Sequence, residues 1–163
     1  MSTKVSHYLQ FALLSLILLP TQSLAFDDIV GVASVVDADT VEVHNTRIRL
    51  HGIDSPESNQ LCTIKDKAYR CGQQAALALD KLVANSTLRC KGSKVDRYKR
   101  LIAVCYLKDQ DINAWLVENG WAIAYRQYSM DYVPQEDAAK SKRVGIWRGE
   151  FEAPWDFRKK RKS

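Results

Sequence analysis

Three carboxylate side chains fall close together in the sequence: Asp39, Asp54 and Glu57. Asp39 opens a predicted strand over residues 40–44, and the other two acids follow a predicted strand over residues 47–51. If these strands are antiparallel neighbours, the end of one lies beside the start of the other, and the acids converge at one edge of a sheet. Clustered carboxylates repel each other unless a hard cation lies between them, and calcium and magnesium prefer oxygen ligands. The spacing therefore indicates a cation site.

Two arginines extend this pattern. Arg49 lies on the polar face of the strand over residues 47–51, and Arg100 ends a charged loop over residues 93–100. The planar guanidinium group suits bidentate contact with phosphate oxygens. Carboxylates, a cation and arginines in one place are suited to phosphoryl transfer, because the cation and the arginines offset charge while a carboxylate positions water.

Each of these residues also has a purely structural interpretation. Asp39 can form a turn, Asp54 can make a local loop bond with Ser55, and Glu57 can be a solvated surface residue. Arg49 can pair with an acid on a neighbouring strand, and Arg100 can be a solvated loop residue. Taken one at a time, the residues do not decide between the two interpretations.

The elements that must position these side chains are read from hydrophobic periodicity and turn residues. Five strands are predicted over residues 28–36, 40–44, 47–51, 88–91 and 101–107. Helices are predicted over residues 72–85, after the capping residue Asp111, and from Pro134 up to Arg143, with Gly145 following the last one. Residues 52–60, rich in Gly, Pro and Ser, are predicted to be a loop. This order predicts an α+β fold, a five-stranded OB-type barrel with about three packed helices.

The start of the chain has the layout of a secretory signal. Lys4 precedes an apolar run that ends at Pro20, and Ser23-Leu24-Ala25 places small residues where a signal peptidase acts. We expect residues 1–25 to be a cleaved signal peptide, residues 26–157 the folded domain, and residues 158–163 a basic tail. An uncleaved anchor is the alternative. Cleavage lowers the formal charge from +5 to +4, because it removes only Lys4, and the exported protein is periplasmic or secreted.

All four cysteines lie beyond the predicted signal. Without a Cys-x-x-Cys pair or a suitable histidine spacing, a zinc site is disfavoured. An even number outside the cytosol indicates two disulfides, for which three pairings exist. We favour the two local pairings, Cys62–Cys71 and Cys90–Cys105, each worth on the order of 3 kcal/mol.

Three segments resemble the signature segments of the staphylococcal nuclease-like (thermonuclease) family, and they occur in that family's order. They are Val36-Asp37-Ala38-Asp39-Thr40, Arg49-Leu50-His51-Gly52-Ile53-Asp54-Ser55-Pro56-Glu57 and Asp96-Arg97-Tyr98-Lys99-Arg100. Later segments, among them Gly120-Trp121-Ala122 and Gly145-Ile146-Trp147, are similar to its exported bacterial members. Ala38 and Lys99 stand where the family commonly has glycine.

The resemblance implies an OB-fold barrel and a set of site roles. Calcium would be held by Asp39, Asp54 and the backbone carbonyl of Ser55, with Asp37 close behind it. Glu57 would orient or deprotonate the attacking water. The remaining roles belong to residues that face the substrate: Arg49 and Arg100, which grip the scissile phosphate, and Tyr98 and Tyr125, which line the nucleotide pocket.

The function expected on this basis is calcium-dependent hydrolysis of phosphodiester bonds in DNA and RNA, with the 5′ oxygen as the leaving group. The enzyme is expected to be an endonuclease and a monomer. A non-catalytic exported OB-fold protein that binds nucleic acid or oligosaccharide is the alternative from another class. A basic protein of the membrane surface is a third, although no strongly amphipathic basic helix supports it. The basic run over residues 158–162 either adds salt-sensitive phosphate affinity or is only solubilising.

Overall fold

The computed structural model describes residues 28–161. The predicted signal peptide, residues 1–25, and the last two residues of the predicted tail lie outside the described residues. Within residues 28–161, every helix is too short or too polar to cross a membrane.

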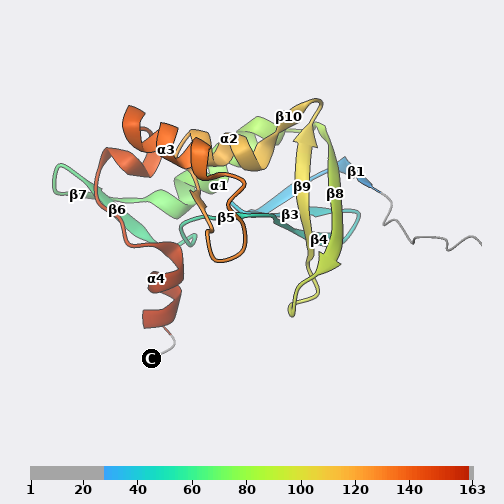
Figure 1. The fold of residues 1–163 in the computed structure, drawn as a ribbon, viewed down its shortest axis with the longest axis horizontal. Helices are drawn as coiled ribbons and strands as arrows, with labels where there is room; N and C mark the ends of the chain where they lie inside the picture. The colour runs from blue at the N-terminus through green and yellow to red at the C-terminus, as the bar shows by residue number, and fades with distance from the viewer. Residues whose placement is uncertain (1–27, 162–163) are drawn as a thin grey trace, which may run out of the picture.

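A curled sheet forms the body of the fold (Figure 1). Its strands follow the order β1-β8-β9-β4-β3-β2, and the short β10 pairs with β9. The strands are β1 (Ile29–Val32), β2 (Ser34–Asp37), β3 (Thr40–Val43), β4 (Thr46–Leu50), β8 (Thr87–Val95), β9 (Leu101–Leu107) and β10 (Gln110–Asp111). β4 and β9 run parallel, whereas the other neighbours are antiparallel.

The predicted first strand is two strands, β1 and β2, separated only by Ala33. β1 pairs with β8 and β2 pairs with β3, so one stretch of chain contributes both ends of the strand order. The sheet therefore curls back on itself, as expected of an OB-type barrel. The predicted class is confirmed, but the predicted count of five strands was low because this strand breaks and short strands were missed.

The short β10 was also missed, and the other missed strands lie outside the main sheet. They are β5 (Ile53–Asp54), which pairs with β11 (Ile123–Ala124), and the hairpin of β6 (Leu61–Ile64) with β7 (Lys67–Arg70). The hairpin turn consists of Lys65 and Asp66, with φ angles of 50° and 62°. Two consecutive residues at positive φ fit a two-residue hairpin turn, but the sequence signal for that turn is Asn-Gly or Asp-Gly. Lys-Asp carries no such signal.

The helices are α1 (Cys71–Val83), α2 (Ile112–Glu118), α3 (Val133–Lys142), the 3₁₀ turn η1 (Gly145–Arg148) and α4 (Pro154–Lys160). Asp111 caps α2 as predicted, because its Oδ1 accepts the backbone N–H of Ala114 at 3.0 Å. α4 was not predicted. It begins at Pro154 and extends past residue 157, so Arg158, Lys159 and Lys160, which we had assigned to the tail, are helical.

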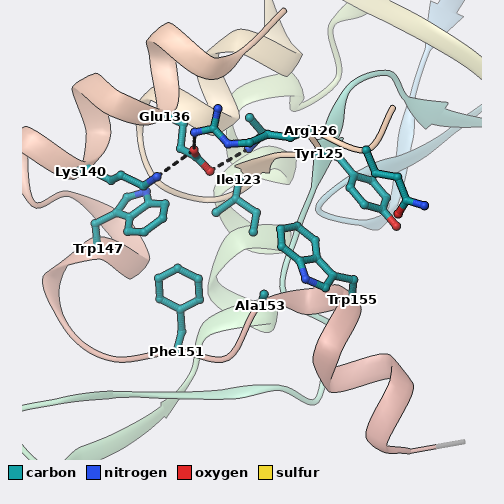
Figure 2. A pocket seen from close by; sticks show the side chains of 11 residues that line it. Ile123, Tyr125, Arg126, Glu136, Lys140, Trp147, Phe151, Ala153 and Trp155 are labelled. Atoms are coloured by element: carbon teal, nitrogen blue, oxygen red, sulfur yellow. Dashed lines mark hydrogen bonds and ion pairs between the residues drawn. The ribbon is translucent and has the colours of Figure 1, made fainter. Parts of the chain in front are cut away.

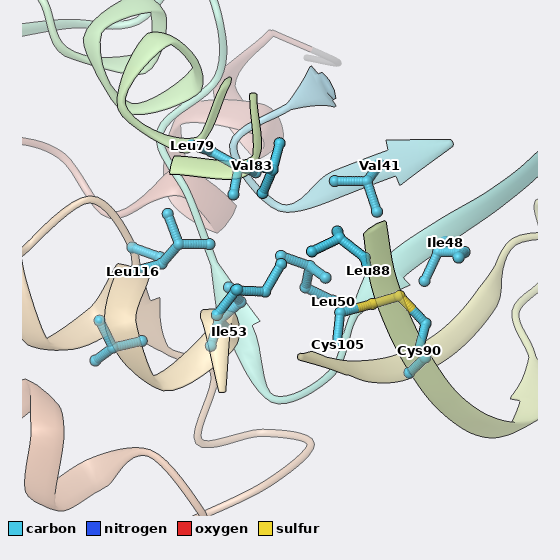
Figure 3. Packing of buried hydrophobic residues seen from close by; sticks show 14 of the residues in the cluster. Val41, Ile48, Leu50, Ile53, Leu79, Val83, Leu88, Cys90, Cys105 and Leu116 are labelled. Atoms are coloured by element: carbon cyan, nitrogen blue, oxygen red, sulfur yellow. A yellow bond between two sulfur atoms is a disulfide. The ribbon is translucent and has the colours of Figure 1, made fainter. Parts of the chain in front are cut away.

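The main core lies between the curled sheet, α1 and α2 (Figure 3). Its fully buried side chains include Val41, Ile48, Leu50, Leu79, Leu88 and Leu116. Both predicted disulfides are present. Cys90–Cys105 joins directly opposed residues of β8 and β9 inside this core, and Cys62–Cys71 ties β6 to the first residue of α1 in a second apolar cluster.

Candidate active site

The site is built around Arg49 on β4. Antiparallel pairing sets Arg49 opposite Thr40 on β3, which places it beside the preceding residue, Asp39. Its Nη1 lies 2.9 Å from Asp39 Oδ2, and its Nη2 lies 2.9 Å from Asp54 Oδ1. The side chain of Asp54 is fully buried, and that of Asp39 is 11% exposed. One guanidinium therefore joins two carboxylates that are 15 residues apart in sequence, as the predicted hairpin requires.

Asp39 is held in place from several directions. Its Oδ2 accepts the backbone N–H of Ser55 at 3.0 Å, and its Oδ1 accepts the hydroxyl of Thr40 at 3.1 Å. Its carbonyl oxygen accepts the backbone N–H of Leu50 at 2.9 Å. These bonds fasten the turn before β3 to the loop that follows β5. The two carboxylates consequently have a fixed spacing.

Glu57 lies on the same loop, which is held by Gln60 and Gly72. The buried Gln60 accepts the backbone N–H of Glu57 through Oε1 at 3.2 Å and donates through Nε2 to the carbonyl of Glu152 at 2.7 Å. Gly72, the second residue of α1, packs so closely that a Cβ there would lie 1.8 Å from the carbonyl oxygen of Glu57. The backbone of Glu57 is thus clamped, while its side chain remains 31% exposed.

A third arginine, Arg158 of α4, also enters the cluster. Its Nη1 lies 3.0 Å from Asp54 Oδ1 and 2.9 Å from Glu57 Oε1, and its Nη2 lies 2.8 Å from Asp54 Oδ2. Sequence reasoning missed this residue, because it placed Arg158 in a tail. Gln60 was also missed. The guanidinium of Arg158 contacts both carboxylates and so links Glu57 to Asp54.

Burial and like charge act on the acids. The pKa of Asp54 is raised, first by burial and then by the charge of Asp39, although Arg158 and Arg49 oppose the shift. The pKa of Asp37 is also raised, by burial first and then by the negative charges of Asp39 and Glu57. Arg49 and Arg100 oppose that shift. Asp37 therefore lies within electrostatic reach of the two acids and of both predicted phosphate-binding arginines.

Arg100 is held by Asp96, a residue whose role the sequence did not indicate. Arg100 Nε donates to Asp96 Oδ2 at 2.8 Å, and Nη2 lies 2.7 Å from the same oxygen. Between them, Lys99 has a φ of 64°, so lysine adopts the conformation that glycine favours. Among the described contacts, Arg100 pairs with no acid of the cluster. Its guanidinium lies 5.4 Å from the ring centroid of the exposed Tyr98.

Tyr125 lies on the other side of the site, next to α4. Its pKa is raised, first by burial and then by the charge of Asp54. Its ring stacks on Trp155 of α4 with centroids 5.4 Å apart. Figure 2 shows both rings on the wall of a cleft of about 510 Å³, which Trp147 and Phe151 also line. Tyr98 lies outside this cleft, beside Arg100, and the role of the two tyrosines at a nucleotide pocket stays a prediction.

The donor chemistry of the cluster suits a hard cation. Asp39 and Asp54 both contact the guanidinium of Arg49, and carboxylate and carbonyl oxygens are what calcium prefers. Within residues 28–161, no three His, Cys, Asp or Glu side chains gather as a ready-made metal cluster. A cation at Asp39, Asp54 and the carbonyl of Ser55 would therefore need water in its remaining positions, and Arg158 would have to leave Asp54.

Comparison with known proteins decides the family. Residues 47–149 match the family described as "Staphylococcal nuclease homologue". The chain belongs to this family. That range contains Arg49, Asp54, Glu57 and Arg100, whereas Asp39 and Arg158 fall outside it and are placed in the cluster by the structure itself.

Three relatives of this staphylococcal nuclease homologue show how far the similarity extends. The succinoglycan biosynthesis protein ExoI of Rhizobium meliloti is 38% identical over 86% of this chain and 76% of its own length. An uncharacterized endonuclease of Haemophilus influenzae is 34% identical over 71% of this chain and 64% of its own length. A micrococcal nuclease of Shigella flexneri is 31% identical over 81% of each. The chain thus spans just under two thirds of the Haemophilus protein and more of the other two.

Proposed function

We propose that this protein is a calcium-dependent nuclease that hydrolyses phosphodiester bonds of DNA and RNA by attack of water, with the 5′ oxygen as the leaving group. The observation that carries this proposal is the buried cluster in which Arg49 joins Asp39 to Asp54 while Glu57 stands at the exposed rim. Membership of the staphylococcal nuclease homologue family and the names of two relatives support it.

Each residue of the cluster has a role in the proposed reaction. Calcium held by Asp39, Asp54 and the carbonyl of Ser55 would supply a Lewis acid that offsets phosphate charge. Glu57 is reachable by water and orients or deprotonates the attacking molecule. Arg49 and Arg100 donate to the phosphate oxygens and stabilise the negative charge that grows as the 5′ oxygen leaves.

The contacts of Arg100 are consistent with its proposed role at the phosphate. Asp96 engages Nε and Nη2 of Arg100, which among the described contacts leaves Nη1 for a phosphate oxygen. Asp37, behind the cluster, adds negative charge that favours a bound cation. Tyr98 and Tyr125 would line the nucleotide pocket. Since most contacts go to phosphate and sugar, base preference should be slight.

The test is a cleavage assay with a defined set of substrates. Purified protein is incubated with supercoiled plasmid, single-stranded DNA and RNA, in calcium or in excess chelator, beside Glu57→Gln. We expect plasmid nicking and RNA degradation in calcium alone, and products with 5′-hydroxyl ends that polynucleotide kinase labels without phosphatase. Cleavage that persists in chelator contradicts the calcium dependence. Tight binding without cleavage in calcium favours the alternative, a non-catalytic binding protein.

We also propose that the protein is exported and acts as a monomer in the periplasm or the medium. Two disulfides support export, because such bonds persist outside the cytosol. Cell fractionation with mass spectrometry of the mature N-terminus tests the predicted cleavage after Ala25. Recovery of the intact N-terminus in the membrane fraction would instead indicate an anchor.

A further inference from the structure

Arg158 takes about half of the hydrogen-bonding capacity of Asp54. A carboxylate offers about four lone-pair positions, two on each oxygen. Oδ1 of Asp54 contacts Arg49 at 2.9 Å and Arg158 at 3.0 Å, and Oδ2 contacts Arg158 at 2.8 Å. The same guanidinium lies 2.9 Å from Glu57 Oε1. One side chain thus engages a proposed cation ligand and the proposed base at once.

The helix that carries Arg158 is fastened to the domain. Its first residue, Pro154, is buried, and Trp155 stacks on Tyr125 (Figure 2). The segment before it pairs with β6 through two backbone bonds of 2.9 Å between Thr63 and Glu150. Gln60 then bridges the Glu57 loop to the carbonyl of Glu152. The position of Arg158 is therefore built into the fold.

A cation and this guanidinium exclude each other. Calcium coordinates carboxylate oxygens at roughly 2.3–2.6 Å, closer than a hydrogen-bonded nitrogen can approach. Arg49 and Arg158 already take three of the lone-pair positions of Asp54. A divalent ion bound at the fourth position would lie close to the positive charge of Arg158 on the same carboxylate, and the two charges would repel each other. Loss of Arg158 from Asp54 is the rearrangement that relieves this repulsion. Arg49, in contrast, is shared with Asp39 and sits on a strand.

We propose that Arg158 is an internal competitor for the cation, which closes the acid cluster when no cation is bound and must withdraw from Asp54 and Glu57 before one is coordinated. This rests on the proposed role of Asp39 and Asp54 as cation ligands. Withdrawal also frees Oε1 of Glu57 from its ion pair, so that this oxygen becomes available to the attacking water. Arg158 thereby sets the cation concentration at which the site opens.

The direct test is calcium affinity, measured by titration calorimetry on the purified protein without nucleic acid. Three variants are compared with the wild type: Arg158→Gln, Arg158→Lys and the matched control Lys159→Gln. The control removes one positive charge from the next, exposed residue of the same helix. If Arg158 closes the cluster about nine-tenths of the time, Arg158→Gln should bind calcium about tenfold more tightly. Arg158→Lys, which keeps the charge but not the bidentate fork, should lie between, and Lys159→Gln should stay within about twofold of the wild type.

Thermal unfolding supplies a second readout that activity does not influence. In chelator, Arg158→Gln should melt below the wild type because the ion pairs to Asp54 and Glu57 are lost. Calcium should then raise its melting temperature by more than it raises that of the wild type, since ligand that binds more tightly stabilises more. If Arg158→Gln does not fold, Arg158→Lys decides the matter by the same comparison.

Equal or weaker calcium binding by the Arg158 variants overturns the competition, as does an equal gain in Lys159→Gln. These outcomes are separable from failure of the proposed nuclease activity. Calcium-dependent cleavage with equal affinities refutes the competition alone. Tighter binding in Arg158→Gln without cleavage by the wild type refutes the nuclease proposal alone. Absence of calcium binding in every variant refutes both.

Discussion

Replacing Arg49 by alanine should destabilise the protein strongly, whereas replacing Arg47, two residues earlier on β4, should not. The Arg49 side chain is 14% exposed, and it pairs at 2.9 Å with the fully buried carboxylate of Asp54 and with the nearly buried one of Asp39. The Arg47 side chain is 63% exposed and has a single contact of 3.4 Å with Glu42. Both substitutions remove an arginine side chain from β4, but Arg49→Ala removes a partner from buried carboxylates, whereas Arg47→Ala removes one from a more exposed carboxylate.

The magnitude follows from the partners. Removing one member of a buried ion pair costs about 3–5 kcal/mol, because the other charge is left uncompensated. Arg158 still contacts Asp54 in the Arg49→Ala variant, so Asp39 is the acid that loses its guanidinium. We therefore expect the lower end, about 3 kcal/mol. Arg47→Ala should cost less than about 0.5 kcal/mol, as is usual for an exposed pair.

The assay is equilibrium urea unfolding at pH 7 in excess chelator, followed by tryptophan fluorescence. With an m-value of about 2 kcal/mol/M, Arg49→Ala should lower the unfolding midpoint by about 1.5 M, and Arg47→Ala by less than about 0.3 M. Arg49→Lys, which keeps the charge but cannot bridge both acids, should fall between them. A loss below about 1 kcal/mol for Arg49→Ala, or equal losses for the two alanine variants, would falsify the buried bridge.

Three further predictions concern the acids and the cross-links. Glu57→Gln should lower the cleavage rate by about 10²–10⁴-fold while leaving the urea midpoint close to that of the wild type, because the side chain lies at the rim. Asp37→Asn should raise the melting temperature at pH 7, and the gain should shrink as pH falls. The raised pKa of Asp37 means that the folded state binds its proton more tightly, so its contribution to stability worsens as pH rises from 3.8 through the folded pKa. Replacing Cys90 and Cys105 by serine should cost about 3 kcal/mol in urea unfolding, as expected for a loop of this length.

The contacts among Asp39, Arg49 and Asp54 could be predicted because these residues lie close together in the sequence. Alternation over residues 40–44 and 47–51 indicated a hairpin, and a hairpin forces the residue before its first strand next to the end of its second. The hairpin therefore predicted that Asp39 would approach the segment containing Asp54, with Arg49 on the polar face nearby, and the structure brings the three side chains together. The paired strands, the opposed cysteines of β8 and β9, and the cap at Asp111 follow from rules of the same short range.

The parts that could not be predicted depend on contacts between distant segments. Arg158 meets Asp54 across 104 residues, and nothing in a run of five basic residues indicates which of them turns inward. From the sequence alone, Gln60 is only a polar residue in a loop. Its role depends on its hydrogen bond to the carbonyl of Glu152, which is distant in sequence. α4 is short, and Pro154 is its only buried residue, so it leaves a weak apolar stripe in the sequence.

The break at Ala33 has a consequence for how the protein must be handled. A single stretch, residues 29–37, covers the outer edge of β8 with β1 and the outer edge of β3 with β2. Trimming about ten residues from the front of the domain would therefore uncover two strand edges at once, and uncovered edges are templates on which chains stack into aggregates. Any expressed form of this protein should therefore keep residues 29–37 intact. Proteolytic cleavage within this stretch should make the protein precipitate before it specifically disturbs the proposed catalytic residues.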